Sequence, residues 1–160
     1  MCMMVYIAAP VPLALVPWNE SQPAFHVCEL REAEVAVQQQ FDVANVFYAG
    51  SHEMCGCGFQ YGQYPQWEDE DRPLKRASLD AFASYLAEQL TRTPFIQIYA
   101  CWDGDQSASP EHHRSLTPSS LHAEDFFFLE KELSIVKPNW PLSSMMARLL
   151  QGIGTSLRRA

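Results

Sequence analysis

The sequence predicts an α+β domain, with a mostly antiparallel sheet of about six strands, one dominant amphipathic helix and a C-terminal helical appendage. Three observations predict this class. Short apolar or alternating segments of strand length recur along the chain, one long segment repeats apolar residues at helical steps, and prolines separate them. The 160 residues suffice for one sizeable core. We therefore expect a single globular domain over residues 1–137, followed by a linker and a short basic amphipathic helical tail over residues 138–160.

Strands are predicted first where apolar residues are continuous. Residues 2–8 and 95–102 are apolar almost throughout, which is typical of strands buried on both faces in the middle of a sheet. Residues 43–50 form a third apolar and aromatic segment, which leads into a Gly-Ser-His turn. Residues 25–30 alternate, so a strand there places His26 and Cys28 on one face.

Two further segments alternate at the period of a strand. Residues 55–61 place cysteines and aromatics on one face and glycines on the other, which predicts a strand paired in a hairpin around residues 50–54. Residues 126–136 alternate between apolar and polar side chains. This pattern predicts a strand that buries Leu133 and exposes Glu132 to water.

The main helix is predicted to begin at Pro73 and to end before Thr93-Pro94. Its apolar residues recur at three- and four-residue steps and form one stripe: Leu79, Phe82, Ala83, Leu86 and Leu90. A short helix is expected over residues 32–41 and a helical turn after Thr117. Residues 103–118 are expected to form a loop or hairpin.

Composition limits the classes of partner. The formal net charge of -8 disfavours nucleic acid, since no basic patch interrupts residues 1–137. Residues 1–17 lack the basic start of a signal peptide, and no other apolar run approaches the length of a membrane span. We expect a cytoplasmic protein, in which five reduced cysteines form no disulfide framework. The apolar stripe of the tail fits either packing on its own domain or homodimerisation.

The candidate site is the segment of residues 50–59, in which His52, Cys55 and Cys57 lie within six residues. Thiolates are soft ligands and imidazole is a borderline one, so this set supplies three corners of a tetrahedral transition-metal site. Zinc or iron is the expected ion. Cys101 or Cys28 would complete the ligand set.

Three further residues are expected near this site. Asp103 and Asp105 follow Cys101 on a turn, where either carboxylate could orient a ligand from outside or act as a base. An Asp-Gly turn that bonds only its own backbone explains the same residues. His26 shares a strand face with Cys28 and is the remaining candidate for a binding role.

Two other functions stay open from the residues alone. Cysteine packs well as a small hydrophobe, so Cys55 and Cys57 also fit the core of a metal-free interaction or ligand-binding module. A thiol-dependent enzyme would use one of them as nucleophile with His52 as base.

Several stretches resemble an uncharacterised family of small bacterial proteins that share a Gly-Ser-His-x-x-Cys-Gly-Cys-Gly-Phe motif, here residues 50–59. The likeness continues in Met1-Cys2-Met3, in residues 23–27, in residues 101–105 and in residues 126–130. The resemblance implies a self-contained domain over most of residues 2–137 and carries no established activity. The tail from residue 138 lies outside it.

Overall fold

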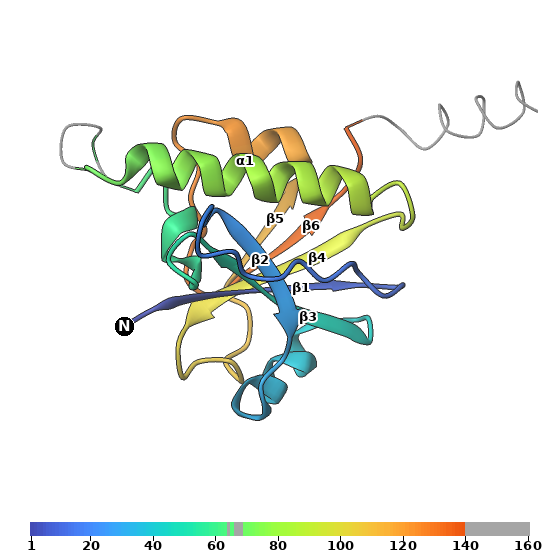
Figure 1. Cartoon of the computed structure of the whole chain (residues 1–160). Helices are drawn as coiled ribbons and strands as arrows, with labels where there is room; N and C mark the ends of the chain where they lie inside the picture. Colours follow the sequence, from blue (N-terminus) through green and yellow to red (C-terminus); the bar gives the residue numbers. More distant parts are fainter. Residues whose placement is uncertain (64, 66–68, 140–160) are drawn as a thin grey trace, which may run out of the picture.

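The computed structural model describes residues 1–63, 65 and 69–139, which form a six-stranded sheet with one long helix (Figure 1). The strands are β1 (Met3–Ala9), β2 (Phe25–Glu29), β3 (Asn45–Ser51), β4 (Ile96–Trp102), β5 (His112–Leu116) and β6 (Glu132–Val136). Their order in the sheet is β2-β3-β1-β4-β6-β5, and every neighbouring pair is antiparallel except β5 and β6. The predicted α+β class is confirmed.

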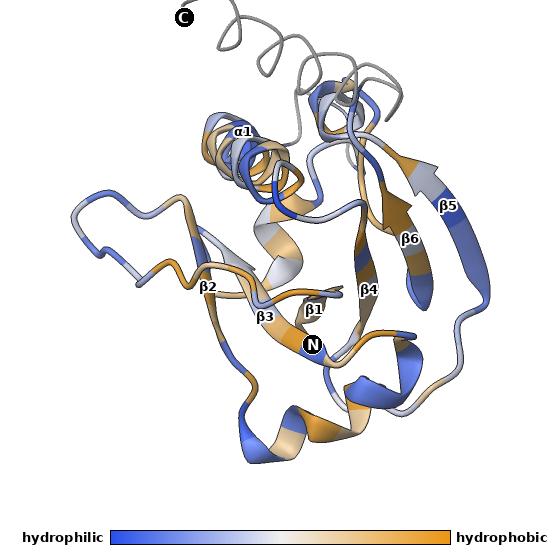
Figure 2. Ribbon diagram, turned by 90° about the vertical axis from the view of Figure 1, so that its right-hand side faces the viewer, coloured by the Kyte–Doolittle hydropathy of each residue, from blue (hydrophilic) through white to orange (hydrophobic). Residues whose placement is uncertain are grey.

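The apolar segments take the central positions in the sheet. β1 is buried along its whole length and lies between β3 and β4, as its unbroken apolar sequence predicts. β4 is buried from Ile96 to Cys101. Figure 2 shows the apolar residues concentrated along these central strands, with the polar β5 at the edge.

One long helix covers one face of the sheet. This helix, α1 (Arg72–Gln89), carries a proline in its first turn and buries the stripe that the sequence predicts, including Leu79, Phe82 and Leu86. Two 3-10 helices, η2 (Gly56–Phe59) and η4 (Pro118–His122), contact α1. The larger core lies between these helices and the sheet.

A smaller core lies on the other face. It contains Tyr6, Tyr48, Tyr99 and Cys101 from the strands and Val37 from the 3-10 helix η1 (Glu32–Gln40). Figure 1 shows the polypeptide of η1 and the loop after β4 on the side of the sheet away from α1. One face of the sheet therefore packs against α1, η2 and η4, and the other face packs against η1.

The strand predicted over residues 55–61, and with it the hairpin around residues 50–54, is wrong. The segment forms a turn and η2 instead. Alternating glycines weaken a strand, and the hydroxyl of Ser51 accepts the backbone N–H groups of Glu53 and Gly58, so a ladder partner is not needed.

The segment 126–136 also differs from its prediction. Only Glu132–Val136 forms a strand, and Glu132 and Ser134 are buried while Ile135 is 38% exposed. The polar face turns inward because Arg114 of β5 pairs with the Glu132 carboxylate at 2.8 Å. β5 itself lies within the predicted loop of residues 103–118. Its sequence is polar because it is an edge strand.

The helical tail predicted over residues 138–160 lies outside the described residues from position 140 onward. None of the helices in the described part of the chain combines the length and apolar character needed to cross a bilayer.

Candidate metal centre

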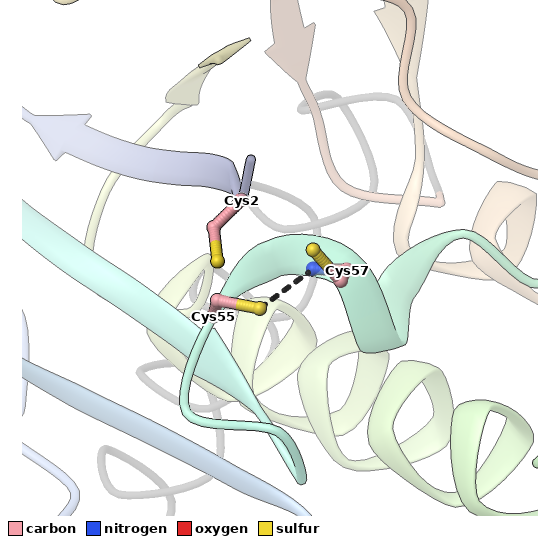
Figure 3. A group of neighbouring side chains, drawn as sticks. All are labelled: Cys2, Cys55 and Cys57. Atoms are coloured by element: carbon pink, nitrogen blue, oxygen red, sulfur yellow. Dashed lines mark hydrogen bonds between the residues drawn. The ribbon is translucent and has the colours of Figure 1, made fainter. Parts of the chain in front are cut away.

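Three thiol sulfurs gather at the start of β1. The Sγ atoms of Cys2, Cys55 and Cys57 all lie within 4.8 Å of one another, the only such group of three that His, Cys, Asp and Glu side chains form among the described residues. Figure 3 shows Cys2 directly before β1 and the other two cysteines at and within η2, with their sulfurs directed toward a shared space. The group can hold a metal ion.

Close packing of η2 on β1 brings the cysteines together. A Cβ atom at Gly56 would lie only 3.0 Å from the backbone oxygen of Met3 and 2.7 Å from Cγ2 of Val5. A glycine is therefore required where η2 meets the strand. Cys55 and Cys57 are the neighbours of Gly56 in the chain, and Cys2 is the neighbour of Met3. The contact of Gly56 with Met3 therefore brings all three cysteines together.

The side chain of Ser51 organises the turn between β3 and η2. Its hydroxyl donates to the carbonyl oxygen of Cys55 at 2.5 Å and accepts from the N–H groups of Glu53 at 3.2 Å and Gly58 at 3.1 Å. Ser51 is fully buried, so water does not compete for its hydroxyl. The positions of both cysteines in the turn follow from this one hydroxyl.

Backbone donors point at two of the sulfurs. The N–H of Met3 donates to Sγ of Cys57 at 3.3 Å, and the N–H of Cys57 donates to Sγ of Cys55 at 3.4 Å. The thiol of Cys55 hydrogen-bonds to the sulfur of Cys57, which lowers the pKa of Cys57 and raises that of Cys55. The first proton of the pair is therefore lost from Cys57, and negative charge is stabilised there.

The spacing of the sulfurs suits a metal with tetrahedral coordination. Zinc binds thiolates at about 2.3 Å, which places two sulfurs of a tetrahedron about 3.8 Å apart. Sulfurs within 4.8 Å of one another reach this geometry with side-chain movements of about 1 Å or less. The carboxylate of Glu53 lies just outside the group, with Oε2 at 3.8 Å from Sγ of Cys55.

His52, predicted as a ligand, lies beside this group and outside it. Its ring nitrogen Nδ1 lies 2.8 Å from Oγ of Ser78 in α1, and its backbone N–H donates to the same oxygen at 3.1 Å. Burial lowers the pKa of His52, so the ring is neutral near neutral pH. Its Nε2 lies 3.7 Å from Oε1 of Glu53. The Glu53 carboxylate therefore lies between the His52 ring and the thiols.

Cys101 and Cys28, predicted to complete the ligand set, are not brought to the other cysteines. Cys101 is fully buried in the smaller core, and this burial raises its pKa to about 12. Cys28 is exposed on the edge strand β2, opposite Tyr48. Tyr48 and Cys101 belong to the smaller core, whereas Cys57 packs against the larger one. Cys28 and Cys101 therefore lie on the opposite face of the sheet from Cys57.

The predicted aspartates lie in a turn after β4. Asp103 donates its backbone N–H to the carbonyl oxygen of Cys2 at 2.9 Å, and Oδ1 of the same residue accepts from Gln106 at 3.2 Å. Asp105 donates its N–H to Trp102 at 3.0 Å. The backbone of Asp103 thus holds the backbone of Cys2, while its carboxylate stabilises the turn through Gln106.

His26, the remaining predicted residue, is 6% exposed and packs between Trp18 and Tyr48. Its Nδ1 has no hydrogen-bond partner among the described residues. Burial lowers the pKa of His26 and keeps the ring neutral. The side chain is part of an aromatic cluster and does not join the three thiols.

Cys2 is the member of the group that the sequence pattern missed. Its distance along the chain from Cys55 hides it from any local motif. One signal was available: Cys2 lies at the end of a strand predicted to be central, so any segment packed across that strand's end meets it.

No protein-family model, no curated protein and no solved structure matches the chain significantly. The family resemblance based on residues 50–59 stays a prediction.

Proposed function

We propose that the protein binds a transition metal ion, zinc or iron, through Cys2, Cys55 and Cys57. The observation that supports this most directly is the mutual approach of the three sulfurs to within 4.8 Å. Soft thiolate ligands select zinc and iron over magnesium or calcium. The partial exposure of Cys55 and Cys57 also favours a site over a sealed apolar core.

The hydrogen bonds around the sulfurs support the same function. Metal-held thiolates are stabilised by donors outside the ligand set, and Met3 and Cys57 supply two backbone N–H groups of this kind. Our candidate for the fourth ligand is Glu53, because its Oε2 already lies 3.8 Å from Sγ of Cys55. A reducing compartment such as the cytoplasm would keep these thiols available to the metal.

Metal binding by the full chain tests the proposal. Purified reduced protein is titrated with Zn²⁺ and with Co²⁺, whose absorption reports thiolate ligation. We expect one ion per chain, and Cys2→Ser, Cys55→Ser and Cys57→Ser should each weaken binding at least about 100-fold, beyond the loss typical of an outer-shell contact.

Three matched variants act as controls. Cys28→Ser and Cys101→Ser remove thiols on the other side of the sheet, and His52→Ala removes the neighbouring imidazole, so all three should keep the metal. Glu53→Gln should change the Co²⁺ spectrum if the carboxylate is the fourth ligand. Substoichiometric metal in the parent protein, or an equal loss of affinity in Cys28→Ser, contradicts the proposal.

A further inference from the structure

The sulfur of Cys57 borders a cavity that metal binding alone does not explain. The cavity has a volume of about 210 Å³, and its walls include Cys57, the polar side chains Glu53 and Lys75, and the apolar side chains Met3 and Trp102. A space of this size admits a small molecule beside the sulfur. Cys57 is therefore the thiol of the group that a substrate in the cavity meets.

The surroundings of Cys57 hold its sulfur beside two other thiols in the metal-free protein. Sγ of Cys57 accepts the Met3 N–H at 3.3 Å and further hydrogen bonds from the Cys55 and Cys2 thiols. The Met3 N–H fixes this sulfur, and Sγ of Cys2 lies within 4.8 Å of it, so a second thiol is in reach of an oxidised Cys57. Lys75, which is 9% exposed and ion-paired with Asp69 at 2.8 Å, brings positive charge to the wall of the same cavity.

We propose that, in the metal-free protein, Cys57 reduces small hydroperoxides that enter this cavity and that Cys2 resolves the oxidised sulfur. The Cys57 thiolate attacks the terminal oxygen of the hydroperoxide, so an S–O bond forms and the O–O bond breaks. The alkoxide or hydroxide that leaves takes a proton from water. Cys57 becomes a sulfenic acid, and the peroxide has gained two electrons.

Cys2 completes the reaction by attacking the oxidised sulfur. An S–S bond forms between Cys2 and Cys57, the S–O bond breaks, and the hydroxyl group leaves as water with the proton of the Cys2 thiol. A reducing dithiol then regenerates both thiols. Cys2 suits this role because it is the exposed thiol of the group and its Sγ lies within 4.8 Å of Sγ of Cys57, whereas the backbone of Cys55 is held by both the N–H and the hydroxyl of Ser51.

The parent protein provides a test without any variant. Chelator-treated full-length protein is exposed to hydrogen peroxide, the remaining thiols are alkylated, and each cysteine is followed by peptide mapping. We expect Cys57 to be oxidised at least about tenfold faster than Cys28, because Cys57 borders the cavity and has a second thiol within 4.8 Å that captures its oxidised sulfur. Since Cys28 is exposed and Cys57 is only partly exposed, reactivity governed by exposure alone gives the reverse order and overturns the proposal.

Variants assign the two roles. Cys57→Ser should abolish peroxide consumption, and Cys2→Ser should leave a sulfenic acid on Cys57 that dimedone traps. Cys28→Ser serves as the control with unchanged consumption, and circular dichroism verifies the fold of each variant. Parental consumption in Cys57→Ser, or a disulfide between Cys55 and Cys57 in the parent, overturns the assignment.

This inference uses the same sulfurs as the proposed metal centre but does not depend on it. A chain that consumes peroxide and binds neither zinc nor iron contradicts the metal proposal alone. A chain that binds metal and oxidises Cys57 no faster than Cys28 contradicts the peroxide proposal alone.

Discussion

At the scale of single residues, the candidate centre depends on a serine more than on the histidine that makes the motif conspicuous. Ser51 contacts the backbone of Glu53, Cys55 and Gly58 through one hydroxyl. His52 directs its ring toward α1. The residue that shapes a site can thus be one that never touches the metal.

Replacing Ser51 by alanine should therefore damage both the fold and the site. The N–H groups of Glu53 and Gly58 lose their partner, and the Cys55 carbonyl oxygen keeps only the N–H of residue 51, which should lower the free energy of unfolding by about 1–3 kcal/mol. Zinc affinity should fall about 10–100-fold because Cys55 and Cys57 are no longer held in place. Urea denaturation and metal titration measure the two effects.

Ser78→Ala is the matched control for Ser51→Ala. Ser78 is equally buried, but its hydroxyl contacts the backbone and ring of His52 instead of the cysteine turn. This variant should lose stability and keep its zinc affinity. Equal zinc affinity in the two serine variants would show that the hydroxyl of Ser51 does not position the thiols.

At the scale of elements, the pairing of β5 with β6 depends on a buried carboxylate. Glu132 is 1% exposed, and it accepts hydrogen bonds from Arg114 at 2.9 Å, from the N–H of Leu129 at 3.2 Å and from Ser134. Arg114 also donates to the carbonyl oxygen of Phe127 at 3.0 Å. The only parallel pair in the described sheet is thereby tied to the irregular segment before β6.

Arg114→Met should destabilise the protein by about 3 kcal/mol, because it leaves the Glu132 carboxylate buried without its cation. Chemical denaturation of the metal-free protein measures this loss. The double variant with Glu132→Gln should recover part of it, since the uncompensated charge is removed as well.

Lys131→Met is the control for a surface pair, because it breaks the exposed contact of Lys131 with Glu111 and should change stability little. A loss for Arg114→Met no larger than that of Lys131→Met would mean that water reaches Glu132.

At the scale of the whole molecule, the sequence predicted the elements whose pattern is set by the core. Unbroken apolar strands and a helical stripe are direct consequences of burial, so β1, β4 and α1 could be predicted. Segments shaped by individual hydrogen bonds could not be predicted in this way. The alternation of residues 55–61 satisfies the period of a strand, but the hydrogen bonds of the Ser51 hydroxyl and the close approach of Gly56 to β1 favour a turn.

The candidate site was predicted in part for the same reason. Cys55 and Cys57 share a turn, so a local motif finds them. The contribution of Cys2 depends on η2 packing over the start of β1, a contact between segments more than 50 residues apart in sequence. Cys28 and Cys101 were assigned to the site because a sequence shows residue type but not which side of the sheet each strand residue faces.

Stability against acid is a property of the whole molecule that two buried histidines should control. Burial lowers the pKa of both His26 and His52 below the ordinary value of 6.5. The unfolded chain therefore binds protons at a pH where the folded chain does not. Their contribution to stability should be complete above about pH 6.5 and should decrease as pH falls from there toward the folded-state pKa values.

We expect unfolding free energy of the metal-free protein to fall below pH 6.5 with a slope of up to about 1.4 kcal/mol per pH unit for each histidine. His26→Gln removes one of the two titrating rings, so its stability should depend less steeply on pH between pH 5 and 7, whatever its stability at neutral pH. The exposed His112→Gln should retain the parental slope. Denaturation midpoints across this range measure the slopes, and identical slopes in all three proteins would show that the buried His26 ring accepts a proton without cost, through water that reaches its unpartnered Nδ1.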